Sequence, residues 1–180
     1  MNLRLTALSI YFPGALKGEG LRKLFQLTAD AFRAPMPDID RLSHPEKLRA
    51  YARFTQEQTQ QVKSEDVDPL KERLFRNSRQ MGIELREQLH VGTFGESLTA
   101  ARLLYRALGI DFRSNEKGEL EIKRCYFSEF YSGQVCRLIS SLDEGLMAGL
   151  SDGGRLSFRT RITEGHSCCL AKVEFGKQER

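Results

Sequence analysis

The sequence predicts an α+β fold, in which a helical N-terminal half packs on a C-terminal ββαββ unit that forms an antiparallel sheet. Two observations carry this prediction. Apolar residues recur at helical spacing through residues 1–108, and from 109 to 176 they alternate with polar residues on either side of one further helix. We expect one domain over residues 1–180, with a helical layer at 1–108 and the ββαββ unit at 109–180.

The first helices are defined by their spacing and by the residues at their ends. Leucine and phenylalanine side chains share one helical face over residues 21–32. The stretch "APMPDIDRL" ends that helix, because proline lacks a backbone donor and disfavours helix before it. Ser43 and Glu46 then form a capping box, which predicts the start of the next helix.

Two more helices follow in the N-terminal half. Asp68 is the expected N-cap of the first, with Pro69 at its first position. Gly82 lies in the middle of that helix, where glycine favours a bend or a break. The stretch "TFGE", with Thr93 and Glu96, is a second capping box, and the helix that it starts is expected to end at Gly109.

A first hairpin is expected around the turn-like stretch "SNEKG". Apolar residues alternate on both sides of it, so pairing them places all four on one face of the sheet. The predicted pairs are Ile110 with Ile122 and Phe112 with Leu120. The alternation changes parity before Cys125, which predicts a bulge near Lys123 and Arg124.

A helix is expected next, with Ser132 as its N-cap, and a second hairpin follows it. A two-residue type II′ turn centred on Gly165 and His166 would close this hairpin. The predicted pairs are Thr163 with Cys168, Ile162 with Cys169, Thr160 with Ala171, Arg159 with Lys172, Phe158 with Val173 and Leu156 with Phe175. In this register Cys169 faces the core and Cys168 faces away from it.

Composition bounds the class of protein. The 28 basic and 24 acidic residues give a net charge of +4 with no long basic run, so we expect no nucleic-acid partner. The apolar N-terminal stretch is too short to span a bilayer, and we expect no membrane partner, although an amphipathic segment touching a membrane is an alternative. Four cysteines with no evident secretory signal predict a reduced, cytoplasmic protein.

Three residues of the ββαββ unit could carry chemistry. Cys125 ends a strand, Cys136 lies in the first turn of the next helix, and Asp143 follows two turns later. They converge with the Cys168–Cys169 pair if strand end, helix start and hairpin turn meet. A thiol nucleophile needs a lowered pKa, which a helix N-terminus favours, and a metal needs several such ligands. The structural alternative is that these thiols pack as small apolar side chains and that Asp143 is the polar edge of a helix.

Arginines and aromatic residues near the thiols suggest how a ligand would be held. Arg161 lies on the outer face of the second hairpin, and Arg137 lies in the first turn of the preceding helix. If another element covers them, they form a pocket for an anion, and otherwise they are a solvated face. Tyr131 belongs to an aromatic group that would line a pocket between the sheet and the N-terminal helices.

The last third of the chain resembles a known family. The stretches "KRCYFSEFYSGQVCRLISSLDEGLMAGL" and "LSFRTRITEGHSCCLAKVEF" contain a Cys, an aromatic cluster, a second Cys, an acidic residue late in a helix, and a strand ending before a further Cys. This order resembles the bacterial L-2-amino-thiazoline-4-carboxylic acid hydrolases and, more distantly, the vinyl-4-reductase type of small-molecule-binding domain. The positions that match are Cys125, Cys136, Asp143, Gly165 and one of Cys168 or Cys169.

The resemblance implies one of two functions. The first is hydrolysis of a C–N or C–S bond in a small, anionic cyclic amidine, with Cys136 or Cys125 as nucleophile, Asp143 as base or orienting group, and Arg137, Arg161 and Tyr131 binding the substrate. The alternative is a non-catalytic domain that binds or senses a small molecule. The distant relatives hold zinc, so the chain is expected either to hold no cofactor or to bind zinc through Cys125, Cys136 and Cys168. A homodimer is compatible with both functions.

Overall fold

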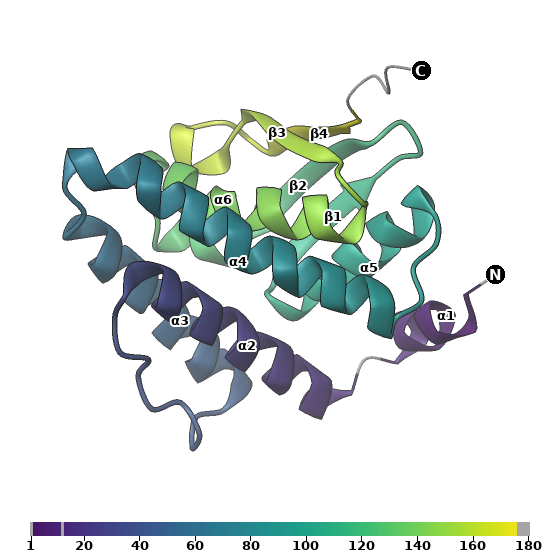
Figure 1. Ribbon diagram of the computed structural model, residues 1–180, viewed down its shortest axis with the longest axis horizontal. Helices are drawn as coiled ribbons and strands as arrows, with labels where there is room; N and C mark the ends of the chain where they lie inside the picture. Colours follow the sequence, from purple (N-terminus) through teal and green to yellow (C-terminus); the bar gives the residue numbers. More distant parts are fainter. Residues whose placement is uncertain (1, 12, 176–180) are drawn as a thin grey trace.

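The computed structural model describes residues 2–11 and 13–175, and it has the α+β architecture that the sequence predicts (Figure 1). The helices of the N-terminal part are α1 (Leu3–Ile10), α2 (Gly14–Phe32), α3 (His44–Gln60), α4 (Val67–Gln88) and α5 (Phe94–Ala107). The C-terminal part contains β1 (Ile110–Ser114), β2 (Glu119–Cys125), α6 (Gly133–Leu150), β3 (Arg155–Thr160) and β4 (Cys169–Glu174). Among the described residues, no helix combines the length and the apolar character that crossing a bilayer requires.

The four strands form one antiparallel sheet in the order β1-β2-β4-β3. Its inner face is buried by side chains that alternate along the strands, among them Phe112, Leu120, Leu156, Ala171 and Val173. Helix α6 packs against β3 and against α4, so it lies between the sheet and the N-terminal helices (Figure 1). Helix α2 packs on α3 and α4, and α5 packs on β1. The core therefore extends from the inner face of the sheet into the helical layer.

The helix-start signals are confirmed, with one correction. The backbone N–H of Ser43 donates to the Glu46 carboxylate at 2.8 Å, and Thr93 and Glu96 form the second capping box. Helix α4, however, begins at Val67, because a short 3-10 turn over Ser64–Asp66 leads directly into it. Pro69 is thus in the third position of the helix rather than in the first, where its missing N–H is still no loss.

The first hairpin has the predicted face but another register. Phe112 lies opposite Ile122 and Ser114 lies opposite Leu120, two residues from the predicted pairs. The Asn115 side chain sets this register, because its Oδ1 atom accepts hydrogen bonds from the N–H groups of Lys117 and Glu119, both at 3.0 Å. The register changes between Ile110 and Phe112, and Ile110 pairs with Cys125. The bulge predicted at Lys123 and Arg124 is therefore present.

The second hairpin is also shifted by two residues, and its predicted turn is wrong. Leu156 lies opposite Val173 and Phe158 lies opposite Ala171. The connection is a longer loop, over residues 161–168. It contains a 3-10 turn over Ile162–Glu164 that ends at Gly165, whose φ is +90°. Lys172 consequently faces Ser157 instead of Arg159. From Leu156 to Phe158 the shift of two residues keeps the predicted faces, and Cys169 is buried in the core as predicted. The register changes again between Phe158 and Thr160, so that Thr160 lies opposite Leu170.

Helices α4 and α6 approach closely because glycines line their contact. Gly82 does not break α4: a Cβ atom there would lie 2.5 Å from the carbonyl oxygen of Leu146 on α6. A Cβ on Gly145 would come closer than 3.0 Å to the Phe75 carbonyl group and the Ser78 hydroxyl, and one on Gly149 would meet α4 in the same way. The glycines that weaken each helix therefore allow the two backbones to touch.

The Gly145→Ala variant is expected to lower the free energy of unfolding by about 1–3 kcal/mol, because a methyl group has to push α4 and α6 apart. Gly18→Ala on α2 is the matched control. A Cβ there meets nothing within 4 Å, so that variant should gain up to about 1 kcal/mol from helix propensity. Urea denaturation followed by circular dichroism measures both. Equal stability of the two variants would contradict close packing of α4 on α6.

Candidate functional site

A cavity of about 120 Å³ lies between the inner face of the sheet, α6 and the helical layer. Its wall is almost wholly apolar. The aliphatic and sulfur-containing side chains that contribute to it include Leu21, Leu24, Met81, Leu104, Ile122, Leu142 and Leu146. Aromatic rings complete the wall, namely those of Tyr51, Tyr105, Phe127, Tyr131 and Phe158. This is the construction expected of a small-molecule pocket, with a few polar groups set in an apolar wall.

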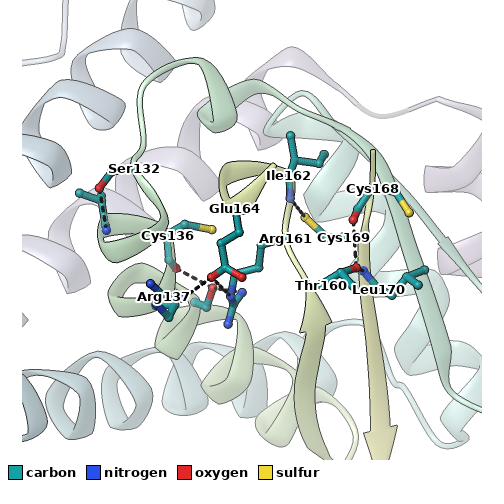
Figure 2. A network of polar contacts seen from close by, with 12 residues as sticks. Ser132, Cys136, Arg137, Thr160, Arg161, Ile162, Glu164, Cys168, Cys169 and Leu170 are labelled. Carbon is teal, nitrogen blue, oxygen red and sulfur yellow. Dashed lines mark hydrogen bonds and ion pairs between the residues drawn. The ribbon is translucent and has the colours of Figure 1, made fainter. Parts of the chain in front are cut away.

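The structure brings three of the four thiols to this cavity. Cys125 is the last residue of β2 and directly follows the bulge. Cys136 lies in the first turn of α6, and Cys169 begins β4 on the inner face of the sheet. Cys168 lies outside the cavity lining, and Figure 2 shows its sulfur on the other side of β4 from that of Cys169. Strand parity thus selects Cys169 from the adjacent pair.

Burial opposes ionisation of the thiols. The pKa of Cys125 is raised to about 12, chiefly by burial and in part by the neighbouring Asp143 and Cys136, although the backbone N–H groups of Phe127 and Ser128 act in the opposite direction. Burial also raises the pKa of Cys169, whose sulfur accepts a hydrogen bond from the Ile162 N–H at 3.4 Å. These two thiols are therefore protonated at neutral pH, which does not favour them as nucleophiles.

Asp143 is the carboxyl group of the cavity. Burial raises its pKa to about 6, while a hydrogen bond from Tyr105 and the charge of Arg161 hold the value lower than burial alone would. The Tyr105 hydroxyl donates to Asp143 Oδ1 at 2.7 Å. The ring of Tyr105 stacks on Phe112, with 4.8 Å between the ring centroids, which fixes the direction of that donor. Asp143 is thus oriented from α5 and close to ionisation near neutral pH.

Arg161 is a largely buried cationic group of the cavity, which Lys17 of α2 also lines. Its side chain is 12% exposed, and its guanidinium lies 4.2 Å from the centroid of the Phe158 ring. Its Nη1 atom donates to the Ser140 hydroxyl at 2.9 Å, and its Nε atom lies 3.7 Å from the Glu164 carboxylate. The predicted outer-face position of Arg161 is therefore wrong, because the loop after β3 turns this side chain toward α6.

Of the two other predicted binding residues, Tyr131 lines the cavity and Arg137 does not. Arg137 lies outside the cavity lining and donates from Nη1 to Glu164 at 2.6 Å, while 61% of its side chain is exposed (Figure 2). It therefore acts on the site only through the carboxylate that it shares with Arg161. Tyr131 lines the cavity, and its hydroxyl lies 2.5 Å from Thr55 Oγ1.

The hydroxyl groups of Tyr51 and Tyr131 donate hydrogen bonds to threonines of the protein and not to a ligand. Thr28 donates to the Leu24 carbonyl at 2.7 Å, so the 3.1 Å contact between Thr28 and Tyr51 needs the tyrosine as donor. Thr55 likewise donates to backbone carbonyls of α3, which makes Tyr131 the donor in its contact with Thr55. The charged side chains of the cavity that remain to meet a ligand are Arg161 and Lys17 as donors and Asp143 as acceptor.

The arrangement does not support the predicted metal site. Cys168 is turned away from the cavity that Cys125 and Cys136 line. Within residues 2–11 and 13–175, no group of three or more His, Cys, Asp or Glu side chains is placed to hold a metal ion. The expected third thiol is on the wrong face because adjacent residues of a strand point to opposite sides.

Three polar residues of the site, Tyr105, Tyr51 and Ser140, were not expected from the sequence. Tyr105 and Tyr51 carry hydroxyl groups on otherwise apolar helix faces, and such a group needs a partner inside the protein. That signal marks them as buried polar groups but names no partner. Ser140 lies one turn after Cys136 and accepts from Arg161, a contact that only the loop after β3 creates.

Comparisons of the chain with protein-family models, with curated proteins and with solved structures gave no match. The resemblance described above therefore stays a prediction, and the cavity is interpreted from its own geometry and chemistry.

Asp143→Asn is expected to remove one pH-dependent part of the stability. The folded protein holds the Asp143 proton up to about pH 6, whereas the unfolded chain releases it near 3.8. The folded state binds the extra proton in this window, so its stabilising contribution is present at low pH and is lost as the pH rises. The asparagine variant should lose that fall in the free energy of unfolding.

Urea denaturation from about pH 4 to about pH 7 measures this difference. Glu116→Gln removes a carboxylate that is exposed in the turn after β1, and it should keep the wild-type profile. Parallel profiles of the wild-type protein and Asp143→Asn would show that the carboxyl of Asp143 titrates as in the unfolded chain.

Proposed function

We propose that this protein binds a small, largely apolar molecule in the cavity beside α6, as the distant resemblance to small-molecule-binding domains implies. The observation that carries the proposal is the largely apolar, aromatic wall, whose charged side chains are one acceptor, Asp143, and two cationic donors, Arg161 and Lys17. An apolar cavity of about 150 Å³ takes up benzene. A molecule of about one aromatic ring with a single polar group therefore fits the volume and the chemistry.

Packing energetics also support a ligand. Core side chains normally fill their space, and an empty volume of this size forgoes many van der Waals contacts. The glycine contact of α4 with α6 shows that this chain brings elements together where its residues allow it. Aromatic rings and hydroxyl groups with fixed partners form part of the cavity wall next to that contact. A bound molecule would supply the missing contacts.

Gly20→Leu is expected to weaken binding at least roughly tenfold, because a leucine side chain occupies space that the ligand needs. Gly20 lines the cavity, and a Cβ there meets nothing within 4 Å, so the substitution fills space without a clash at its Cβ. Phenol, aniline and benzoate are suitable probes, followed by ligand-observed NMR and by the thermal shift of the protein.

Gly18→Leu is the matched control for this variant. It lies on the same helix, its Cβ also meets nothing within 4 Å, and it is outside the cavity lining. The control should bind the probes as the wild-type protein does, and both variants should keep the far-ultraviolet circular dichroism spectrum. Failure of all three probes to bind, or equal binding by Gly20→Leu and wild type, would refute the proposed pocket.

Hydrolysis of a small cyclic amidine is the second candidate function, and the pKa of Asp143 favours it. A carboxyl group with a pKa of about 6 is suited to acid–base catalysis near neutral pH. Its carboxylate would take a proton from water as the water oxygen bonds to the amidine carbon. The same proton would then pass to the leaving nitrogen or sulfur as the ring bond breaks. Cys136, in the first turn of α6, is the predicted nucleophile that this route makes unnecessary.

Turnover of 2-amino-thiazoline-4-carboxylate tests the hydrolase. If Asp143 is the base, the rate should rise between about pH 5 and about pH 7, as its carboxylate forms, and Asp143→Asn should lose roughly 100-fold or more. Cys136→Ser should abolish turnover only if its sulfur attacks the ring. Absence of substrate loss, measured by liquid chromatography, would exclude this hydrolysis and leave the binding proposal standing.

A further inference from the structure

A second hollow, of about 710 Å³, lies on the outside of the protein between α5 and the bulged end of β2. Its floor includes β1 and the short 3-10 helix Tyr126–Glu129 that follows β2. We call it the outer groove. Ile110 and Cys125, the pair formed at the bulge, line both the outer groove and the inner cavity. The two hollows are therefore separate volumes that share one wall.

Four cationic side chains surround the outer groove, and all four are exposed. Arg102 and Arg106 lie one turn apart on α5, and Lys123 and Arg124 are the consecutive residues of the bulge. The acidic side chains of its lining are Asp111 and Glu129. Asp111 lies 3.5 Å from Arg113, which offsets its charge. The groove thus carries a net positive charge before any ligand is bound.

The protein leaves most of these cations without a partner. In the part of the chain that the structure describes, Arg106 and Arg124 form no ion pair within 4.0 Å. Arg102 donates to the uncharged hydroxyl of Ser114 at 3.1 Å, and Lys123 lies 3.8 Å from Glu121, beyond hydrogen-bond distance. Like charges gathered in one hollow repel one another, and an anion would relieve that repulsion.

The bulge of β2 is what places two of the cations side by side. In a regular strand, consecutive side chains point to opposite faces, so either Lys123 or Arg124 would face the core. The extra residue lets both remain exposed, while Ile122 and Cys125 on either side face inward. Bulges are common where a strand has to re-aim side chains beside a functional site.

We propose that the outer groove binds a small molecule that carries a diphosphate or triphosphate group. Arginine guanidinium groups match phosphate oxygens with paired donors, and three of the four cations are arginines. Several cations converge on one hollow, so a group with several charges fits it better than a single carboxylate. The volume admits a phosphorylated organic molecule, and Tyr126 in the lining offers an aromatic surface to its organic part.

Isothermal titration calorimetry of the full chain with inorganic phosphate, pyrophosphate and tripolyphosphate tests this site. At an ionic strength of about 0.1 M, affinity should rise along the series as more oxygens meet the cations. The double variant Arg106→Gln, Arg124→Gln should bind pyrophosphate roughly tenfold more weakly or worse. Melting temperatures equal to that of the wild-type protein would show that this double variant and its control are folded.

The double variant Arg155→Gln, Arg159→Gln is the matched control. It removes the same charge from exposed positions of β3, outside the outer groove, so its affinity should stay within about twofold of wild type. Equal weakening by both double variants would mean that only net charge matters, and absence of pyrophosphate binding would exclude the site. Tighter binding of single-stranded RNA than of tripolyphosphate would replace the proposal with a nucleic-acid surface. None of these outcomes bears on the inner cavity, which Gly20→Leu tests separately.

Discussion

The contact of α6 with α4 is the constraint on which the rest of the structure depends. At about 100° per residue, Gly145 and Gly149 lie on the side of α6 opposite Cys136 and Ser140. The glycines let the α4 backbone approach closely, and this approach fixes the rotation of α6 about its axis. The side that bears the thiol and the hydroxyl is then turned toward the cavity, and Asp143 with it. The polar groups of the site are thus positioned by residues that have no side chains of their own.

Much of this fold follows from the sequence, because its signals are local. Capping boxes, proline breaks and period-two alternation each involve neighbouring residues. With helical spacing, they identified helices α2 to α6, the strands and the bulge of β2, but not α1. The strand registers did not follow, since the turns set them. Asn115 closes the first hairpin with its side chain, and a 3-10 turn lengthens the second. In the regular parts of both hairpins the shift is of two residues, so the predicted faces survive there, and a further register change between Phe158 and Thr160 precedes the misplaced Arg161.

The candidate site could be predicted from the sequence only where the alternation of side chains along a strand decides which way a residue points. Alternation placed Cys169 inward, and the bulge brought Cys125 to the same cavity. Parity says nothing about contacts between distant elements, so the hydrogen bond from Tyr105 to Asp143, across 38 positions of the chain, was not foreseen. Arg161 was misplaced for the same reason: it leaves the strand pattern at a loop whose geometry depends on α6. A periodic sequence pattern carries no information about conformations that tertiary contacts determine.

The bulge of β2 serves the two faces of the sheet at once. One additional residue turns Cys125 inward, to pair with Ile110 at the wall of the cavity, and leaves Lys123 and Arg124 together outside. A regular strand would place the thiol on the other face and divide the cations between the faces. The apolar interior and the cationic exterior at this edge therefore have a common cause. Because Ile110 and Cys125 belong to both walls, a displacement of this pair changes the shape of both hollows.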